Sequence, residues 1–144
     1  RLGKLFFRGS RLALKMLSSS KGKCRSDDMQ VVRIYSGDDG ESHFEEIDLP
    51  YEAITGAERT ALQSASSIHF RRYQPGNFLD FHVAPRRQYV ITLSGQAEIG
   101  LGDGTKRIFN AGDVLLADDL TGKGHTTAAV GDAPRVSIAI PLEE

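Results

Sequence analysis

The sequence has few cysteines, no long apolar run and none of the common catalytic motifs. Cys24 is the single cysteine, so an intrachain disulfide and a cysteine-based zinc cluster are both excluded. No apolar stretch approaches the roughly 20 residues that a helix needs to cross a bilayer. A Walker phosphate loop, a G-x-S-x-G nucleophile turn and an H-E-x-x-H metal motif are also missing.

Acidic residues are absent from the first 26 positions, which hold eight lysines and arginines. The other 118 residues hold 10 basic and 19 acidic side chains, a net charge of −9. The chain is therefore a basic arm, residues 1–26, joined to an acidic body, residues 27–144. An acidic body argues against nucleic acid as the main partner, because binding to phosphates relies on lysine and arginine.

The basic side chains of the arm, at positions 1, 4, 8, 11 and 15, recur at helical spacing with apolar residues on the other side. This pattern predicts a basic amphipathic helix. Its arginine- and serine-rich, acid-poor composition resembles an organellar transit peptide, for a plastid or mitochondrion. Docking onto a protein complex or a membrane surface is a second interpretation, and a disordered tail is a third. The protein is expected to be soluble or peripheral.

The body is expected to be one all-β domain of many short strands separated by glycine-containing turns, typical of a sandwich or barrel. A short helical turn is expected within residues 51–65, where Thr55 can cap a helix and Glu58 follows three positions later. The predicted strands cover residues 31–35, 42–49, 67–73, 78–82, 88–93, 96–101, 105–109, 113–117, 125–130 and 135–140.

One segment of the body, residues 76–95, reads GNFLDFHVAPRRQYVITLSG. It resembles the first sequence motif of the cupin family, which runs glycine, five residues, H-x-H, three or four residues, glutamate, six residues, glycine. Gly76, His82 and Gly95 match that motif at the right spacing.

A later segment resembles the second cupin motif. Residues 112–118 match its start, and His125 matches its histidine after a slightly longer turn. The resemblance covers roughly residues 65–141. It implies that the body is a cupin jelly-roll barrel, also called a double-stranded β-helix.

The resemblance also implies a metal site, but an incomplete one. Cupins hold a divalent metal with three histidines and one glutamate, and here Ala84 and Gln88 stand where the second histidine and the glutamate are expected. His82 and His125 remain as candidate metal ligands, suited to Fe, Mn, Ni, Cu or Zn. The alternative is that they are neutral, hydrogen-bonded histidines that line a small pocket.

Three further residues are candidates for binding a ligand or cofactor. Strand alternation places Asp80 on the same face as His82, and Gln88 is expected to face inward from the next strand. Arg87 lies at a strand end, where it can clamp a carboxylate or phosphate, although ordinary surface charge is the alternative.

The predicted strand 67–73 carries another group of polar side chains at alternating positions. His69, Arg71 and Tyr73 share one face there. The interpretation adopted for this face is that it is solvated, although the same side chains could enter the pocket.

Two functions fit these features. The first is a small-molecule-binding module that takes a small polar or anionic ligand in the barrel, with metal-dependent activity left open. The second is a non-catalytic accessory subunit, docked through residues 1–26 onto a larger organellar complex such as a membrane, photosynthetic or respiratory assembly. A homodimer formed through sheet edges is compatible with either.

Overall fold

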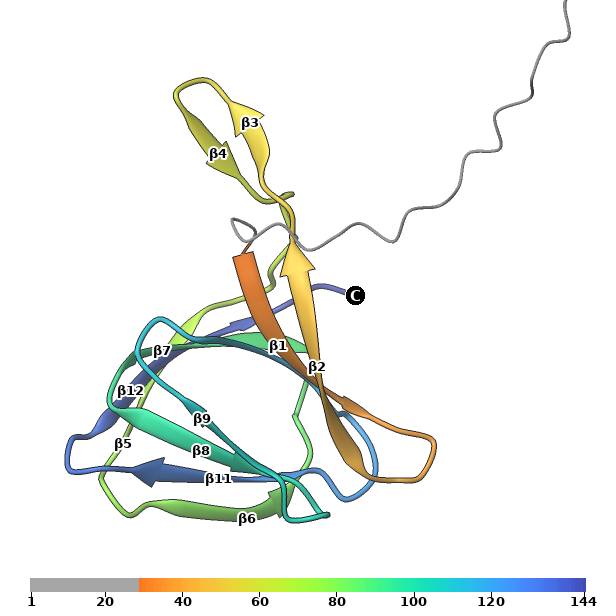
Figure 1. Cartoon of the computed structure of the whole chain (residues 1–144), viewed down its shortest axis with the longest axis vertical. Coiled ribbons are helices and arrows are strands. Elements are labelled where there is room, and N and C mark those ends of the chain that lie inside the picture. The colour runs from red at the N-terminus through yellow and green to blue at the C-terminus, as the bar shows by residue number, and fades with distance from the viewer. Residues whose placement is uncertain (1–28) are drawn as a thin grey trace, which may run out of the picture.

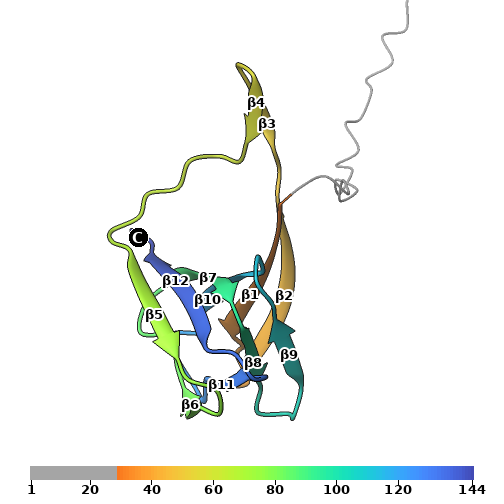
Figure 2. The same ribbon diagram turned by 90° about the vertical axis from the view of Figure 1, so that its left-hand side faces the viewer.

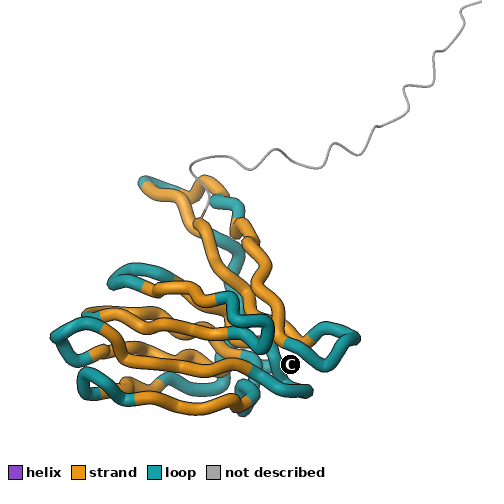
Figure 3. Tube along the Cα trace, turned by 60° about the horizontal axis from the view of Figure 1, so that its bottom comes forward, coloured by secondary structure: helices purple, strands orange, loops and turns teal. Residues whose placement is uncertain are grey.

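The computed structural model describes residues 29–144. The expected amphipathic helix, organelle address and docking role of residues 1–26 lie outside this range. Within it, the regular secondary structure is entirely β-strand, as Figure 3 shows by colour. None of the described residues forms a helix long and apolar enough to cross a membrane.

Twelve strands make up the described chain. The first four lie before the segment that resembles a cupin, and the other eight follow within it. Their bounds are β1 Met29–Ser36, β2 Ser42–Leu49, β3 Glu52–Ile54, β4 Ala57–Arg59, β5 His69–Tyr73, β6 Phe78–His82, β7 Gln88–Ser94, β8 Gln96–Gly100, β9 Lys106–Phe109, β10 Val114–Asp118, β11 His125–Val130 and β12 Arg135–Pro141.

The strands β5 to β12 are divided between two facing sheets (Figure 1). One sheet has the order β2-β1-β10-β7-β12-β5, and the other has the order β6-β11-β8-β9. Without β1 and β2, the two sheets have the orders β10-β7-β12-β5 and β6-β11-β8-β9, which is the arrangement of an eight-stranded jelly roll. The predicted cupin-type jelly-roll fold is therefore confirmed by strand order.

The first two strands extend the larger sheet beyond the jelly roll. β1 pairs with β10 in parallel and with β2 in an antiparallel ladder. The alternation of β1 sends Val32 and Ile34 toward the interior between the sheets, while Val31 packs on the outer face of the larger sheet. This extension closes one side of the barrel interior.

The expected helical turn within residues 51–65 is wrong. Glu52 pairs with Arg59 and Ile54 with Ala57, so β3 and β4 form a small hairpin that projects from the barrel (Figures 1 and 2). Gly56 has a φ of 75°, which is left-handed backbone that breaks a helix and suits a tight turn. The turn preference of Gly56 thus outweighs the capping pattern around Thr55.

The main core lies between the two sheets. β7 and β10 face it from the larger sheet, and β8 and β9 face it from the smaller one. Its buried side chains are Ile34, Ala84, Val90, Ala97, Ile99, Leu101, Phe109, Leu115 and Ala117. Toward β5, β6, β11 and β12 the same interior opens into a cavity.

Candidate functional site

A cavity of about 240 Å³ lies between the two sheets. That volume is below the roughly 300–1,000 Å³ of sites for drug-sized ligands, so a small molecule is what it can hold. Much of its wall is apolar, formed by side chains such as Leu79, Val90 and Ile99. The polar side chains on its wall are Arg71, Tyr73, His82, Gln88, His125, Thr127 and Arg135.

Two histidines face each other at one end of this cavity. His82 ends β6 and His125 begins β11, and the two residues are directly paired across the strands. Their ring centroids are 4.5 Å apart, with 58° between the ring planes. The sequence-predicted pair His82 and His125 therefore meets in space, on the wall of one cavity.

Each histidine is oriented through Nδ1. His82 Nδ1 donates to the backbone carbonyl of Asp80 at 2.7 Å, and His125 Nδ1 lies 2.6 Å from Asp119 Oδ2. Because a carbonyl oxygen and a carboxylate only accept, both rings carry their proton on Nδ1 when neutral. Nε2 of each ring then keeps a lone pair that can act as acceptor, base or ligand.

The partner of His125 is a buried carboxylate that sequence reasoning missed. Asp119 follows β10 and is fully buried, and its Oδ2 also accepts a 2.8 Å hydrogen bond from Ser42 Oγ on β2. Its Oδ1 has no hydrogen-bond partner within the described chain. A carboxylate behind an imidazole fixes the orientation of the ring. The acid six residues before His125 was the available signal, but only the fold shows that it reaches the ring.

A glycine allows the histidines to approach. Gly124 has a φ of 77°, and a Cβ built on it would overlap the carbonyl of His82. A side chain at this position would push β6 away from β11. The two-glycine turn before His125 therefore permits the close pairing of the two rings.

Of the other positions considered for metal or ligand binding, some line the cavity and one does not. Gln88 is buried and lines the cavity, as does Ala84. Asp80 does not line it: its side chain is exposed and accepts from the backbone N–H of Phe81. The expectation for Asp80 fails because β6 has an irregularity. His82 pairs with His125 but Leu79 with Thr127, so one extra residue in β6 turns Leu79 inward instead.

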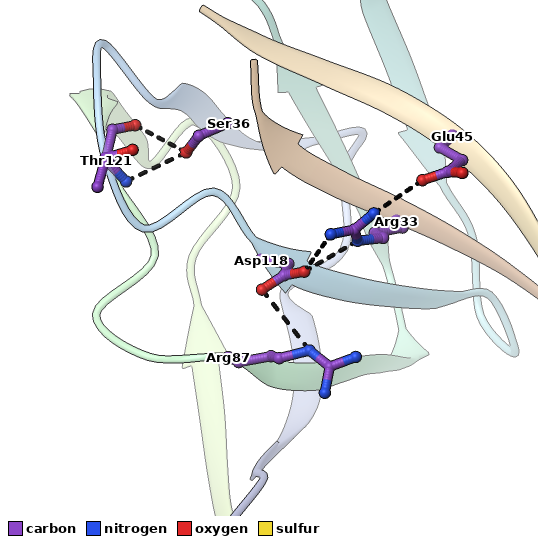
Figure 4. Close-up of polar contacts among 6 residues, drawn as sticks. All are labelled: Arg33, Ser36, Glu45, Arg87, Asp118 and Thr121. Carbon is purple, nitrogen blue, oxygen red and sulfur yellow. Dashed lines mark hydrogen bonds and ion pairs between the residues drawn. The ribbon is translucent and has the colours of Figure 1, made fainter. Parts of the chain in front are cut away.

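Arg87 also lies away from the cavity wall. It forms an ion pair with Asp118, with 3.6 Å from Nε to Oδ1 (Figure 4). Asp118 in turn accepts two hydrogen bonds from Arg33, which also pairs with Glu45. Arg87 therefore belongs to an ion-pair network on the outer face of the larger sheet, and its expected role in holding a cofactor has no support from its placement.

Arg71 and Tyr73 correct another expectation. Both line the cavity, so the inner face of β5 is not a solvated face, whereas His69 on the same strand is exposed. Arg135 at the start of β12 lines the cavity as well and is 4% exposed. Its guanidinium lies 6.0 Å from the Tyr73 ring centroid.

The two arginines have no counter-ion within residues 29–144. The Nε atoms of Arg71 and Arg135 are both buried without a hydrogen-bond partner in that range. Burial, and secondly the charge of Arg71, lower the pKa of Arg135 to about 10. Sequence reasoning missed Arg135, which follows the 131–134 turn as an unremarkable charged residue before an apolar strand.

The donors on the cavity wall do not fit the metal site of the family. Two imidazoles are present, but alanine cannot ligate and the amide of Gln88 is a weak, neutral ligand. Among residues 29–144 no three His, Cys, Asp or Glu side chains are grouped to hold an ion. Two positive guanidiniums on the same wall further oppose a cation. Metal binding by His82 and His125 stays a prediction.

Several solved structures are similar to part of this chain. An uncharacterised conserved protein with a double-stranded β-helix domain from Klebsiella pneumoniae has 25% identity and a TM-score of 0.45, over 56% of this chain and 70% of its own. A cupin-like protein from Thermotoga maritima has 24% identity and a TM-score of 0.45, over 52% of this chain and 55% of its own. A cupin 2 conserved barrel domain protein from Salinispora arenicola has 24% identity and a TM-score of 0.44, over 53% of this chain and 61% of its own.

No protein-family model matches the sequence, and no curated protein matches it. At these TM-scores the superpositions carry no argument about function. The strand order described above identifies the fold, and the side chains on the cavity wall are what remain for function.

Proposed function

Starting from a cupin-type jelly-roll fold, we propose that this chain is a binding module that takes one small polar or anionic molecule in the cavity between its sheets. The observation that supports this most is the pairing of His82 and His125 on the wall of a cavity that combines apolar and polar side chains. Apolar walls with a few convergent polar groups are what small-molecule sites share.

Different residues on the cavity wall would contact different parts of the ligand. Gln88 offers both an amide donor and an acceptor, and each histidine offers Nε2. Asp119 holds His125 in one orientation, so that its Nε2 is ready to accept a proton or a hydrogen bond from the ligand. Leu79 and Val90 exclude water from the ligand's apolar part.

The experiment is a titration with small acids and polyols, followed by methyl NMR of Leu79 and Val90. We expect lactate or glycerol at millimolar concentration to shift these signals in the full chain. Ala84→Leu fills the cavity and is expected to abolish the shifts, while Ala53→Leu, on the exposed β3, serves as the matched control. Shifts that persist in Ala84→Leu, or their absence with every compound, would contradict the proposal.

A divalent metal held loosely by the two histidines is a separate prediction, checked by elemental analysis of the purified chain. Stoichiometric metal that is lost in His82→Ala and His125→Ala, but kept in His43→Ala, would support it. His43 is the matched control because it lies on β2, away from the cavity wall. An equal metal content in all four proteins would refute it.

The alternative proposal is an accessory subunit that docks through residues 1–26. Its support is the charge asymmetry of the sequence and the replacement of two expected metal ligands by Ala84 and Gln88. The test is deletion of residues 1–26, compared with a chain that carries the same 26 residues in scrambled order. Unchanged assembly and localisation in the deleted chain would refute docking.

A further inference from the structure

A buried arginine, Arg135, and a half-buried one, Arg71, lie on neighbouring strands of the cavity wall. Arg135 on β12 pairs in register with Tyr73 on β5, and Ser137 pairs with Arg71. Arg135 and Arg71 are therefore diagonal neighbours on the inner face of adjacent strands, a distance that long side chains can bridge. Both reach the same cavity.

The body carries a large excess of acid, yet none of it is placed against these guanidiniums. Asp118, which pairs with Arg33 and Arg87, lies on the outer face of the sheet. A buried charge without a counter-ion destabilises a fold, and two like charges add repulsion. An external anion between the two guanidiniums would offset both costs.

We propose that Arg71 and Arg135 bind the carboxylate of a small organic acid in the barrel cavity, a statement that rests on the proposed ligand-binding function. A guanidinium presents its N–H groups as a planar fork that matches a carboxylate. The ring of Tyr73, which also lines the cavity, lies beside the Arg135 guanidinium. The arginine pair thus anchors the charged end of the ligand.

The rest of the wall favours an organic acid over an inorganic anion. Leu79, Val90 and Ile99 face the same space and can cover a short carbon skeleton. The histidines stand toward the other end of β11 from Arg135, because β11 runs from His125 to Val130 and a short turn then leads to Arg135. They can therefore meet a hydroxyl or carbonyl group on the far end of the same acid.

The experiment compares each acid with its uncharged amide of nearly the same shape. The probes are propionate against propionamide and lactate against lactamide, titrated by calorimetry and by NMR of the arginine Nε–H groups. We expect each acid to bind about tenfold or more tightly than its amide, the range of a charged hydrogen bond. Equal affinity of acid and amide would overturn the proposal.

Substitutions test whether the two arginines cause the preference for an acid over its amide. Arg135→Met and Arg71→Met are expected to reduce the acid–amide ratio to near one. Arg72→Met is the matched control, because Arg72 directly follows Arg71 on β5 but is exposed on the opposite face. If Arg135→Met does not fold, Arg135→Lys is used, which keeps the charge but loses the fork, and a fall in acid affinity is expected. An equal loss in Arg72→Met would contradict the assignment.

The outcomes separate this inference from the function on which it rests. If acids and amides bind equally and Ala84→Leu blocks both, the cavity binds small molecules but the carboxylate assignment fails. If no compound binds, both fail. Competition by phosphate or chloride as strong as that by propionate would show an inorganic anion site and overturn the organic-acid assignment.

Discussion

Arg135 combines burial with an unbalanced charge. The pKa of its guanidinium falls to about 10, mainly through burial and then through Arg71. For a basic group, a pKa below the unfolded value means that the charged form is less stable in the folded state. Arg135 therefore weakens the ligand-free fold at neutral pH.

This predicts a stabilising substitution. Arg135→Met should raise the free energy of unfolding of the ligand-free chain by roughly 1–3 kcal/mol at neutral pH. The gain should be full below about pH 10 and shrink above it, because the unfolded arginine then binds more protons than the folded one. Urea unfolding at several pH values measures it. Destabilisation at pH 7 would mean that Arg135 has a structural partner instead.

Gly124 and Gly76 together distinguish the cost of a left-handed φ from the cost of a close contact. Gly124→Ala meets both a left-handed φ and the His82 carbonyl, whereas Gly76→Ala meets a φ of 83° and open space. We expect Gly124→Ala to lower the free energy of unfolding by roughly 2 kcal/mol or more, and Gly76→Ala by about 1 kcal/mol. Denaturant curves of the two variants test the difference. Equal losses would show that β6 and β11 can separate freely.

At the scale of elements, β6 shows how one inserted residue changes a site. Regular alternation from His82 would bring Asp80 inward, but the irregularity opposite β11 brings Leu79 instead. One carboxylate is thereby kept out of the cavity, and the wall keeps a net positive character. The ligand preference of the site thus depends on a local irregularity in one strand.

The β3–β4 hairpin is structurally separate from the barrel. All its residues are exposed, and its two strands pair with each other alone among the described strands. Replacing residues 52–59 with a glycine–serine linker should change the free energy of unfolding by no more than about 0.5 kcal/mol. Ile34→Ala in the core, by contrast, should cost roughly 2–5 kcal/mol. Thermal unfolding compares them, and a large loss for the linker variant would show that the hairpin packs on the barrel.

A pH-dependent pair joins the turn before β2, through Asp39, to the start of β2, through His43. His43 Nε2 lies 2.9 Å from Asp39 Oδ2, which raises the pKa of His43, while the hydrogen bond to His43 lowers the pKa of Asp39. The stability that the pair adds is lost as pH rises through the pKa of His43, and as pH falls through that of Asp39. It is therefore confined to weakly acidic pH.

His43→Gln should accordingly destabilise the chain at about pH 5 and have little effect at about pH 8. His69→Gln is the matched control, since His69 is exposed on β5 and forms no ion pair within residues 29–144. Denaturant unfolding at both pH values gives the comparison. The same loss at both values would exclude the ion pair as its cause.

At the scale of the whole molecule, the cavity joins the two sheets. Arg71 and Arg135 belong to the larger sheet, and His82 and His125 to the smaller one. A ligand that contacts both should stabilise them together, by an amount that grows with its concentration. We expect propionate to slow amide hydrogen exchange in β5 and β12 and, to a similar degree, in β6 and β11. Protection of the larger sheet alone would place the ligand outside the shared cavity.

Much of this protein can be read from the sequence. Glycine turns and short alternating segments indicate the strands β5 to β12 closely, since turns require residues that accept positive φ. The resemblance to the two cupin motifs implies that His82 and His125 share one site, and Gln88 lies on the same cavity wall. The sequence also shows the charge asymmetry of residues 1–26.

The tertiary structure alone decided which face of each strand meets the cavity. On β12 the larger apolar side chains Val136, Ile138 and Ile140 point away from the interior, while Arg135 and Ser137 point into it. A period of two separates the faces of a strand but does not say which one is inside when both sides of a sheet are partly covered. The choice depends on register, irregularities such as that in β6, and the space left between the sheets. For that reason the two histidines could be found from the sequence, and the arginine pair could not.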